Sequence, residues 1–285
     1  LDLYLFQLLN GLGLGMIYFL IAVGLTIIFG LLNFVNFAQG AFFLLGAYLC
    51  YTAVAITGSF WLALLIAPLV VAALAWAVER LLIKRFYHLP HTFQILVTLG
   101  IALIIQEASV LIWGPVGKNI AVPPELRGVL ILGDFIYPYY RLFLIGFAAL
   151  IGVGLWLLLE RTRFGALVRA GSESTETVSL LGTNIFLLFS LTFALGVGLA
   201  GVAGVLFALL RGAQPFVGPE ILGIAFVVVV IGGMGSFSGA LVGGLLVGVV
   251  QSLMTTLWPQ GASLMIYGAM AVVILVRPYG LFGRA

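Results

Sequence analysis

The stretch LLNGLGLGMIYFLIAVGLTIIFGL, residues 8–31, decides the class of fold. Roughly 20 apolar residues in a helix are enough to cross the bilayer core of about 30 Å. No charged side chain occurs between Asp2 and Glu79, so the apolar character continues far beyond this stretch. The chain opens Leu1-Asp2, without the basic segment of a cleavable signal peptide, and residues 8–31 are therefore expected to remain as a membrane span.

The whole composition repeats this pattern. Of 285 residues, 64% are hydrophobic and 7% are charged, whereas a soluble domain carries about 25% charged residues. Nine apolar runs follow one another, and the sequence predicts an all-α polytopic membrane protein with about nine transmembrane or re-entrant helices. The segment at 218–232 is short for a full crossing and is expected to be tilted, broken or re-entrant. The runs fall near 8–31, 38–57, 60–82, 92–113, 140–160, 185–210, 218–232, 239–257 and 262–276.

Lysine and arginine set the expected orientation, because short cytoplasmic loops carry an excess of both. With nine spans, one side holds eight of them: Arg80, Lys84, Arg85, Arg161, Arg163, Arg169, Arg277 and Arg284. The other side holds four: Lys118, Arg127, Arg141 and Arg211. This asymmetry predicts an outer N-terminus and a cytoplasmic C-terminus.

Glycines recur at helical spacing within the predicted spans. Gly235, Gly239 and Gly243 are four residues apart, as are Ala240, Gly244 and Gly248, and Gly198, Gly201 and Gly204 are three apart. Small residues one turn apart let membrane helices approach closely. We expect tight helix packing along these rows, with hinge-like movement as the alternative.

The longest polar segment on the predicted inner side is residues 161–184. Ser172 is a suitable N-cap, and Glu173 and Glu176 would lie in the first turn, at the positive end of the helix dipole. Leu180 and Leu181 form an apolar end, and a glycine follows as a natural stop. The segment is expected to form a short amphipathic helix on the cytoplasmic face, ready to contact a partner.

Several motifs resemble one family. Residues 161–184 contain Phe164-Gly165, Arg169-Ala170 and Leu181-Gly182, which are similar to the cytoplasmic coupling segment of permeases of the branched-chain amino acid family of ATP-binding-cassette importers. Four further stretches match in order and extend the likeness over the whole chain: Asn33–Gly40, Ala200–Gly204, Gly232–Ser236 and Arg277–Gly283. Relatives usually have alanine at Val178 and isoleucine at Thr183, so the detailed contacts to an ATPase are expected to differ. They often have histidine at Gln39, so no proton-linked role is expected at this position.

The resemblance implies one permease domain, residues 1–285, of the type II importer kind in a prokaryotic cytoplasmic membrane. It implies a second related permease, two cytoplasmic ATPase subunits that bind ATP and Mg, and an external solute-binding protein. The substrate would be a branched-chain amino acid or a related small polar solute. The residues expected to couple the permease to the ATPase are Arg163, Gly165, Arg169, Ala170, Glu173, Leu180, Leu181 and Gly182.

Polar residues inside the spans are candidates for the translocation pathway, because an unpaired polar group is costly in hydrocarbon. Asn33, Asn36 and Gln39 recur at intervals of three and would share one face of a helical turn. They either line the inner end of the pathway or hydrogen-bond broken backbone between the first two spans.

Glu107 lies in the outer part of the fourth span. Intramembrane acids face a cavity or a partner, and a pairing with Arg141 or Arg211 is favoured over contact with substrate. Gln251 is a candidate for a hydrogen bond between helices.

Several other functions find little support. The pair Gly117-Lys118 lacks the spacing of a phosphate-binding loop, so ATP hydrolysis would need a separate subunit. No catalytic constellation, metal-ligand spacing, cofactor motif or nucleic-acid-binding basic patch is present. The remaining alternatives are a secondary transporter, which would need charged groups near midplane, and a passive channel for a solute such as urea.

Overall fold

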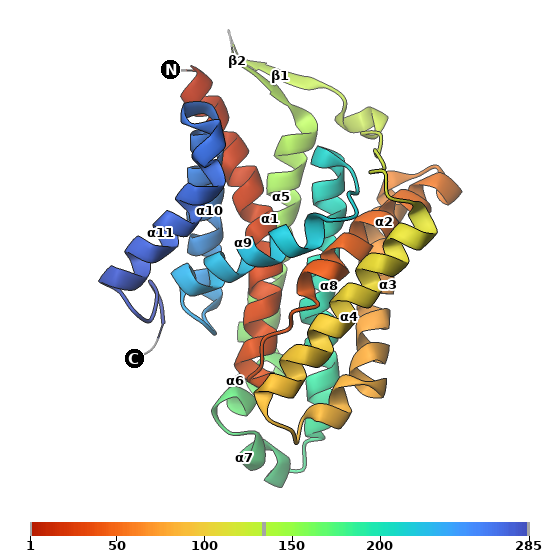
Figure 1. Cartoon of the computed structure of the whole chain (residues 1–285), viewed down its shortest axis with the longest axis vertical. Coiled ribbons are helices and arrows are strands. Elements are labelled where there is room, and N and C mark those ends of the chain that lie inside the picture. Colours follow the sequence, from red (N-terminus) through yellow and green to blue (C-terminus); the bar gives the residue numbers. More distant parts are fainter. Residues whose placement is uncertain (1, 133–134, 284–285) are drawn as a thin grey trace.

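The computed structural model describes residues 2–132 and 135–283. These residues form eleven α-helices and one antiparallel hairpin (Figure 1). The α-helices are α1 (Asp2–Leu32), α2 (Gln39–Thr57), α3 (Phe60–Leu81), α4 (His91–Trp113), α5 (Tyr139–Arg161), α6 (Arg163–Glu173), α7 (Thr175–Leu180), α8 (Ile185–Arg211), α9 (Val217–Gly232), α10 (Phe237–Leu257) and α11 (Ala262–Val276). The other elements are the 3-10 helices η1 (Ile83–Phe86), η2 (Pro124–Leu126) and η3 (Pro259–Gly261) and the strands β1 (Val129–Leu132) and β2 (Phe135–Pro138).

Each predicted span coincides with one helix, and the all-α polytopic fold is confirmed. Eight helices are long and apolar enough to cross a membrane, and the ninth apolar helix is α9. Four of them carry many large apolar side chains on their outer surface: α3, α4, α5 and α11. Such surfaces suit lipid or a partner subunit, since hydrocarbon solvates them as well as a protein interior does.

The helix α1 lies at the centre of the bundle. The most apolar 18-residue stretch of α1 is 83% buried, whereas the corresponding stretches at α4 and at α11 are 17% buried. It packs most extensively against α10 and α8. The stretch that defines the class of fold is therefore also its core, because it is apolar on every face.

The short helix α9 runs across the direction of the other helices (Figure 1). With 16 residues, it is about 24 Å long at 1.5 Å per residue, less than the bilayer core of about 30 Å. It begins beside Gly40 of α2 and ends beside Gly239 of α10. The prediction of a short seventh segment is confirmed, and α9 is enclosed by α1, α2, α10 and α11, where such an orientation is tolerated.

The glycine rows mark the closest helix contacts. On α10, Gly239 and Gly243 face the backbone of α9, whereas Gly244 and Gly248 face the backbone of α1. A Cβ built at Gly244 would lie 2.8 Å from the amide nitrogen of Phe19. Gly235 precedes α10 and makes no such contact, but the other members of the two rows lie on two different faces of this helix, and tight packing is the role that the structure supports for them.

The bundle has two distinct ends, which we call lower and upper after Figure 1. At the lower end, which carries α6 and α7, Lys84 lies over the ring of Phe186 and Gly171 packs on Leu31. At the upper end, which carries the hairpin, Arg141 bonds to Asn10. The basic residues after α3 and α5 thus share the lower end. Arg284 lies outside the described residues.

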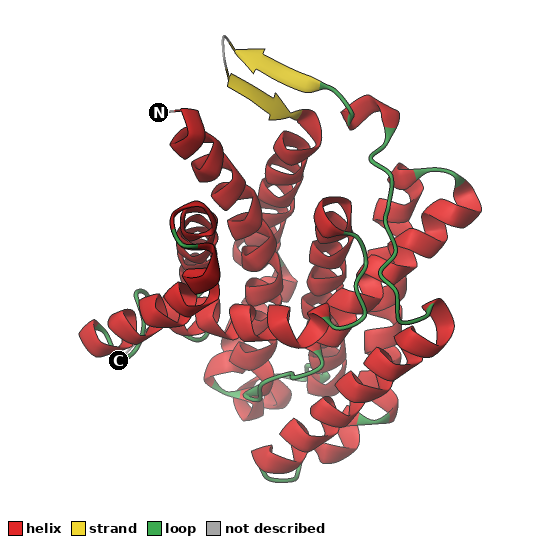
Figure 2. Ribbon diagram, turned by 45° about the horizontal axis from the view of Figure 1, so that its top comes forward, coloured by secondary structure: helices red, strands yellow, loops and turns green. Residues whose placement is uncertain are grey.

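The hairpin was not predicted (Figure 2). It pairs Leu130 with Tyr137 and Ile131 with Ile136 in the connection between α4 and α5. The β-branched and aromatic residues of this connection favour extended pairing. Tyr137 is buried against Phe6 of α1, so the hairpin fixes the upper ends of α1 and α5.

Candidate functional site

The corner between α5 and α6 is rigid. The Thr162 hydroxyl accepts a hydrogen bond of 3.2 Å from the Gly165 amide, which caps α6. A Cβ at Gly165 would lie closer than 3.0 Å to the Leu159 carbonyl oxygen, so only glycine fits. Arg169 donates to that same carbonyl and lies 3.5 Å from Glu160. The contacts of Arg169 are therefore within the chain, and they fix α6 to the end of α5.

The helix α7 corrects the predicted start of the amphipathic helix. Ser172 lies inside α6, and its hydroxyl donates to the Arg169 carbonyl. The N-cap of the second helix is Ser174, whose hydroxyl accepts from the Thr177 amide. The segment predicted as one helix is thus two helices. The second helix begins after Ser174, two residues later than predicted, because serine at this position is also a suitable N-cap.

The lower tip of the molecule is apolar and exposed. Leu180 is 83% exposed and Leu181 is 80% exposed, whereas Val178 is buried beneath them. Gly182 has φ +84°, the left-handed conformation expected of a helix stop. Both leucine side chains are therefore accessible to a partner, and their role as contacts to an ATPase remains a prediction.

The other coupling candidates lie around this tip. Arg163, Ala170 and Glu173 are exposed, and Gly165 is buried. Together, α6 and α7, at the lower end of the bundle in Figure 1, carry exposed charged residues beside two exposed leucines. This combination suits a docked element that transmits movement.

The predicted polar face at 33–39 does not exist, because residues 33–38 are not helical. The helix α1 ends at Leu32, and Asn33 takes φ +55°, which asparagine tolerates better than most residues. Asn33 is exposed, whereas Asn36 and Gln39 are fully buried.

Asn36 and Gln39 hold this break together. The Asn36 amide donates to Gln39 Oε1 at 3.1 Å, and Gln39 Nε2 donates to the Gly196 carbonyl of α8 at 2.9 Å. The Asn36 side-chain oxygen also accepts from the Ala38 amide. This geometry favours the alternative in which they bond broken backbone, and their role in the pathway remains a prediction.

Glu107 is exposed on α4, and its expected ion pair is absent: within the described residues the recorded ion pair is Arg169–Glu160. Arg141 instead donates to Asn10 Oδ1, and Arg211 lies over Phe207. Glu107, Arg141 and Arg211 were expected at a similar depth in the membrane. Similar depth did not predict contact, because α4 lies at the edge of the bundle. A contact of Glu107 with the pathway remains a prediction.

A second acid was missed as a site. Glu79 near the end of α3 is fully buried; the Tyr87 hydroxyl donates to its Oε1 at 2.5 Å and the Ser190 hydroxyl donates to its Oε2. Burial and the nearby carboxylate raise the pKa of Tyr87, which keeps this hydroxyl a donor. The sequence did contain a signal for this site, since Glu79 lies near the end of an apolar run, where a carboxylate needs a partner.

The two glutamates give opposite predictions. Glu79→Ala removes the acceptor of the half-buried Tyr87 hydroxyl and one of the two acceptors of the buried Ser190 hydroxyl, and it should destabilise the protein by about 1–3 kcal/mol. Glu107→Ala removes an exposed group and should leave the midpoint of thermal unfolding in detergent unchanged. Equal midpoints for both variants would contradict the assignment of Glu79 as a structural carboxylate.

The predicted bond from Gln251 is confirmed: its Oε1 accepts from the buried Tyr18 hydroxyl at 2.5 Å, which links α10 to α1. Ser252, the next residue of α10, donates to the Gln7 carbonyl of α1 at 2.8 Å. These bonds hold the upper half of α10 against the central helix.

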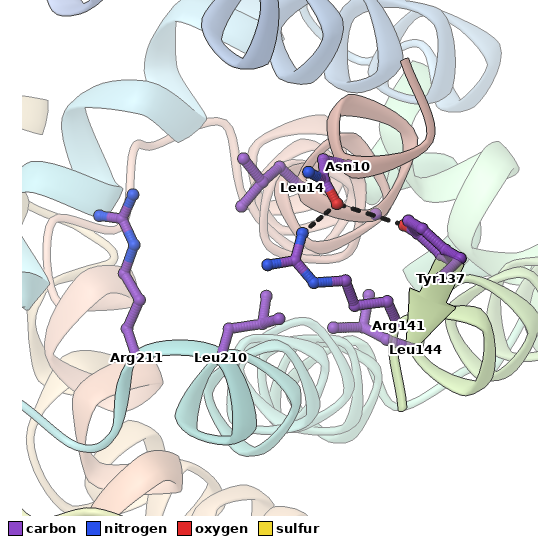
Figure 3. Close-up of a pocket in the computed structure, with 8 residues that line it drawn as sticks. Asn10, Leu14, Tyr137, Arg141, Leu144, Leu210 and Arg211 are labelled. Carbon is purple, nitrogen blue, oxygen red and sulfur yellow. Dashed lines mark hydrogen bonds between the residues drawn. The ribbon is translucent and has the colours of Figure 1, made fainter. Parts of the chain in front are cut away.

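A pocket opens at the upper end among α1, α5 and α8. It has a volume of about 130 Å³, and Arg141 and Arg211 both lie on it (Figure 3). The Asn10 oxygen accepts from Arg141 and from the Tyr137 hydroxyl, the latter at 3.4 Å. Sequence reasoning identified the two arginines but not their convergence, because they are 70 positions apart in the chain.

Comparison with known proteins gives one consistent result. A family model described as the permease component of the branched-chain amino acid transport system matches residues 7–275. The permease protein BraD of the high-affinity branched-chain amino acid transport system of Pseudomonas aeruginosa is 31% identical, covering 99% of this chain and 96% of the relative. No solved structure matches the chain significantly.

Two further relatives represent two different permeases of one system. LivH of Escherichia coli is 29% identical over 99% of this chain and 96% of its own length. LivM of Escherichia coli is 27% identical over 94% of this chain and 68% of its own length.

Proposed function

Because the chain belongs to the family of permease components of branched-chain amino acid transport systems, we propose that it forms part of the translocation pathway of an ATP-driven importer. The proposed substrate is a branched-chain amino acid or a related small polar solute. The observation that supports this most is the family match over residues 7–275, together with the nine apolar helices that the described residues form.

The proposed assembly has five subunits. This chain pairs with a second, related permease, and its similarity to both LivH and LivM supports such a pair. Two cytoplasmic ATPase subunits bind ATP and Mg, and an external binding protein delivers the solute. This chain binds no cofactor and no nucleic acid; lipid surrounds its apolar outer helices.

We propose that residues 1–285 act as one permease domain and that residues 161–184 couple it to the ATPase. Leu180 and Leu181, at the end of α7, would enter a groove on the ATPase subunit. The bond from Arg169 to α5 would transmit the movement of the ATPase subunit to that helix. A rigid element is needed here, because a flexible loop would absorb the displacement.

The proposed location is the prokaryotic cytoplasmic membrane, with the lower end in the cytoplasm. The excess of basic residues at the lower end supports this orientation. The N-terminus would face outward and the C-terminus inward.

Site-directed labelling tests the orientation. Arg127→Cys at the upper end and Arg85→Cys at the lower end, each exposed, are made in a Cys50→Ala protein. In intact cells a membrane-impermeant maleimide should label the first and not the second, and the second should react after permeabilisation. Labelling of both in intact cells would contradict the orientation.

Reconstitution tests the function. The complete complex in proteoliposomes, with binding protein outside and ATP inside, should accumulate radioactive leucine against a gradient. Removal of the ATPase subunits should abolish uptake. Uptake by the permeases alone, driven by an ion gradient or running only downhill as for urea, would replace this proposal with a secondary transporter or a channel.

A further inference from the structure

The upper pocket places two cations in partly apolar surroundings. Figure 3 shows Arg141 and Arg211 on opposite sides of it, with Leu210 between them and Leu14 facing across. Arg141 comes from the first turn of α5, and Arg211 is the last residue of α8. The site therefore depends on the packing of three helices.

Arg141 is held in place by its neighbours. Its Nη1 donates to Asn10 Oδ1, and its Nε donates to the Tyr140 hydroxyl at 3.2 Å. A guanidinium carries five N–H donors, so these bonds leave several of them for another acceptor. The guanidinium of Arg211 lies 5.8 Å from the centre of the Phe207 ring.

Within the described residues neither guanidinium forms an ion pair with a carboxylate, since the recorded ion pair lies at the lower end. Two guanidinium groups at one pocket repel each other unless an anion lies between them. Arginine binds carboxylates in a bidentate fashion, and such charge-assisted bonds are the stronger ones.

Apart from Asn10 and Tyr137, the rest of the lining is aliphatic. Leu14, Leu144 and Leu210 line the pocket together with Gly13. A small pocket with apolar walls and a few polar groups suits one small ligand. The molecule that matches both features has a carboxylate and a branched aliphatic side chain.

We propose that this pocket is an outer subsite at which the permease binds the carboxylate of an aliphatic amino acid before translocation. Arg141 is the fixed contact, Asn10 positions it, and Arg211 closes on the carboxylate from the other side. The leucines contact the aliphatic side chain. This proposal rests on the proposed function, because that function supplies the amino acid.

Chemical protection tests the subsite without transport. The complete complex in nanodiscs, without binding protein, is treated with phenylglyoxal, and the modification of each arginine is followed by mass spectrometry. Leucine and isovalerate, which share the carboxylate, should slow modification of Arg141 and Arg211 by about tenfold at saturation. Leucinamide, which lacks it, should not, and Arg127 outside the pocket should react equally in all samples.

Transport by variants tests the role. Arg211→Gln should raise the KM for leucine by about tenfold or more, with the complex fully assembled, whereas the matched change Arg127→Gln at the same end should leave it unchanged. If leucine protects neither arginine, or if Arg211→Gln behaves as Arg127→Gln does, the subsite is wrong. Equal protection by leucinamide would also overturn it, because the carboxylate would then not be recognised.

The two proposals fail in different ways. Absence of leucine uptake by the wild-type complex would contradict the proposed function. Normal wild-type uptake without protection of the arginines would contradict only the subsite, and the two cations would then be left to contact an acidic surface of the binding protein.

Discussion

Replacing Leu180 or Leu181 with aspartate will release the ATPase subunits from the purified complex. Both side chains are exposed at the tip of α7, and the variants should still insert and fold, because no span is altered. A central apolar anchor contributes about 2–4 kcal/mol to a protein interface, so the loss of affinity should be about 30-fold to 1000-fold. Subunit stoichiometry after affinity purification measures it, and leucine uptake should fall in parallel.

The control is Leu89→Asp. Leu89 is an exposed leucine in the other loop of the lower end, between η1 and α4. The substitution Leu89→Asp introduces the same charge outside the coupling segment and should leave the number of ATPase subunits in the complex normal. Full ATPase content with normal ATP turnover in the α7 variants would return residues 161–184 to the status of an ordinary cytoplasmic loop.

The second large effect is expected where α10 meets α1. A Cβ at Gly248 would lie closer than 3.0 Å to the backbone of Gly11 and Gly15. Backbone atoms cannot rotate away, so Gly248→Ala must separate two helices along the longest contact of the bundle. Overpacking of this kind costs about 1–3 kcal/mol, and Gly248→Leu should prevent folding. The free energy of unfolding in mixed micelles measures the effect of Gly248→Ala. The yield of monodisperse protein measures the effect of Gly248→Leu.

Gly146 on α5 is the matched control for this prediction. A Cβ there would meet no atom within 4 Å. Gly146→Ala should therefore be neutral or slightly stabilising, because alanine has a higher helix propensity than glycine by about 1 kcal/mol. If the two alanine variants were equally stable, the close approach at Gly248 would not limit the packing of α1 and α10.

The sequence was a good guide wherever one physical quantity dominates. The length of an apolar run determines whether a helix crosses a bilayer, so the spans and the shortness of α9 were predictable. Small residues one turn apart bring backbones together, so the rows at Gly244 and Gly248 predicted contact. The partner of each row was not predictable, because spacing defines a face of one helix and not what lies against it.

Local competition explains two errors. Ser172 and Ser174 are both suitable caps; in the structure Ser172 lies inside α6, which Arg169 joins to α5, and Ser174 caps α7. Asn33, Asn36 and Gln39 fit a helical face as a pattern. The chain breaks there instead: the Asn36 side chain accepts from the buried Ala38 amide, and Gln39 donates to the Gly196 carbonyl, which joins α2 to α8.

By itself, the sequence determined that this chain is a polytopic α-helical membrane protein of one permease family, because apolar length and short ordered motifs are local properties. Only the tertiary structure decided which polar groups meet. Glu79 accepts from Tyr87, which follows η1, and from Ser190 of α8, whereas Glu107 is exposed. Arg141 and Arg211 lie on one pocket. The reason is that the free energy of a polar group depends on partners from distant parts of the chain, which the packing of whole helices brings together.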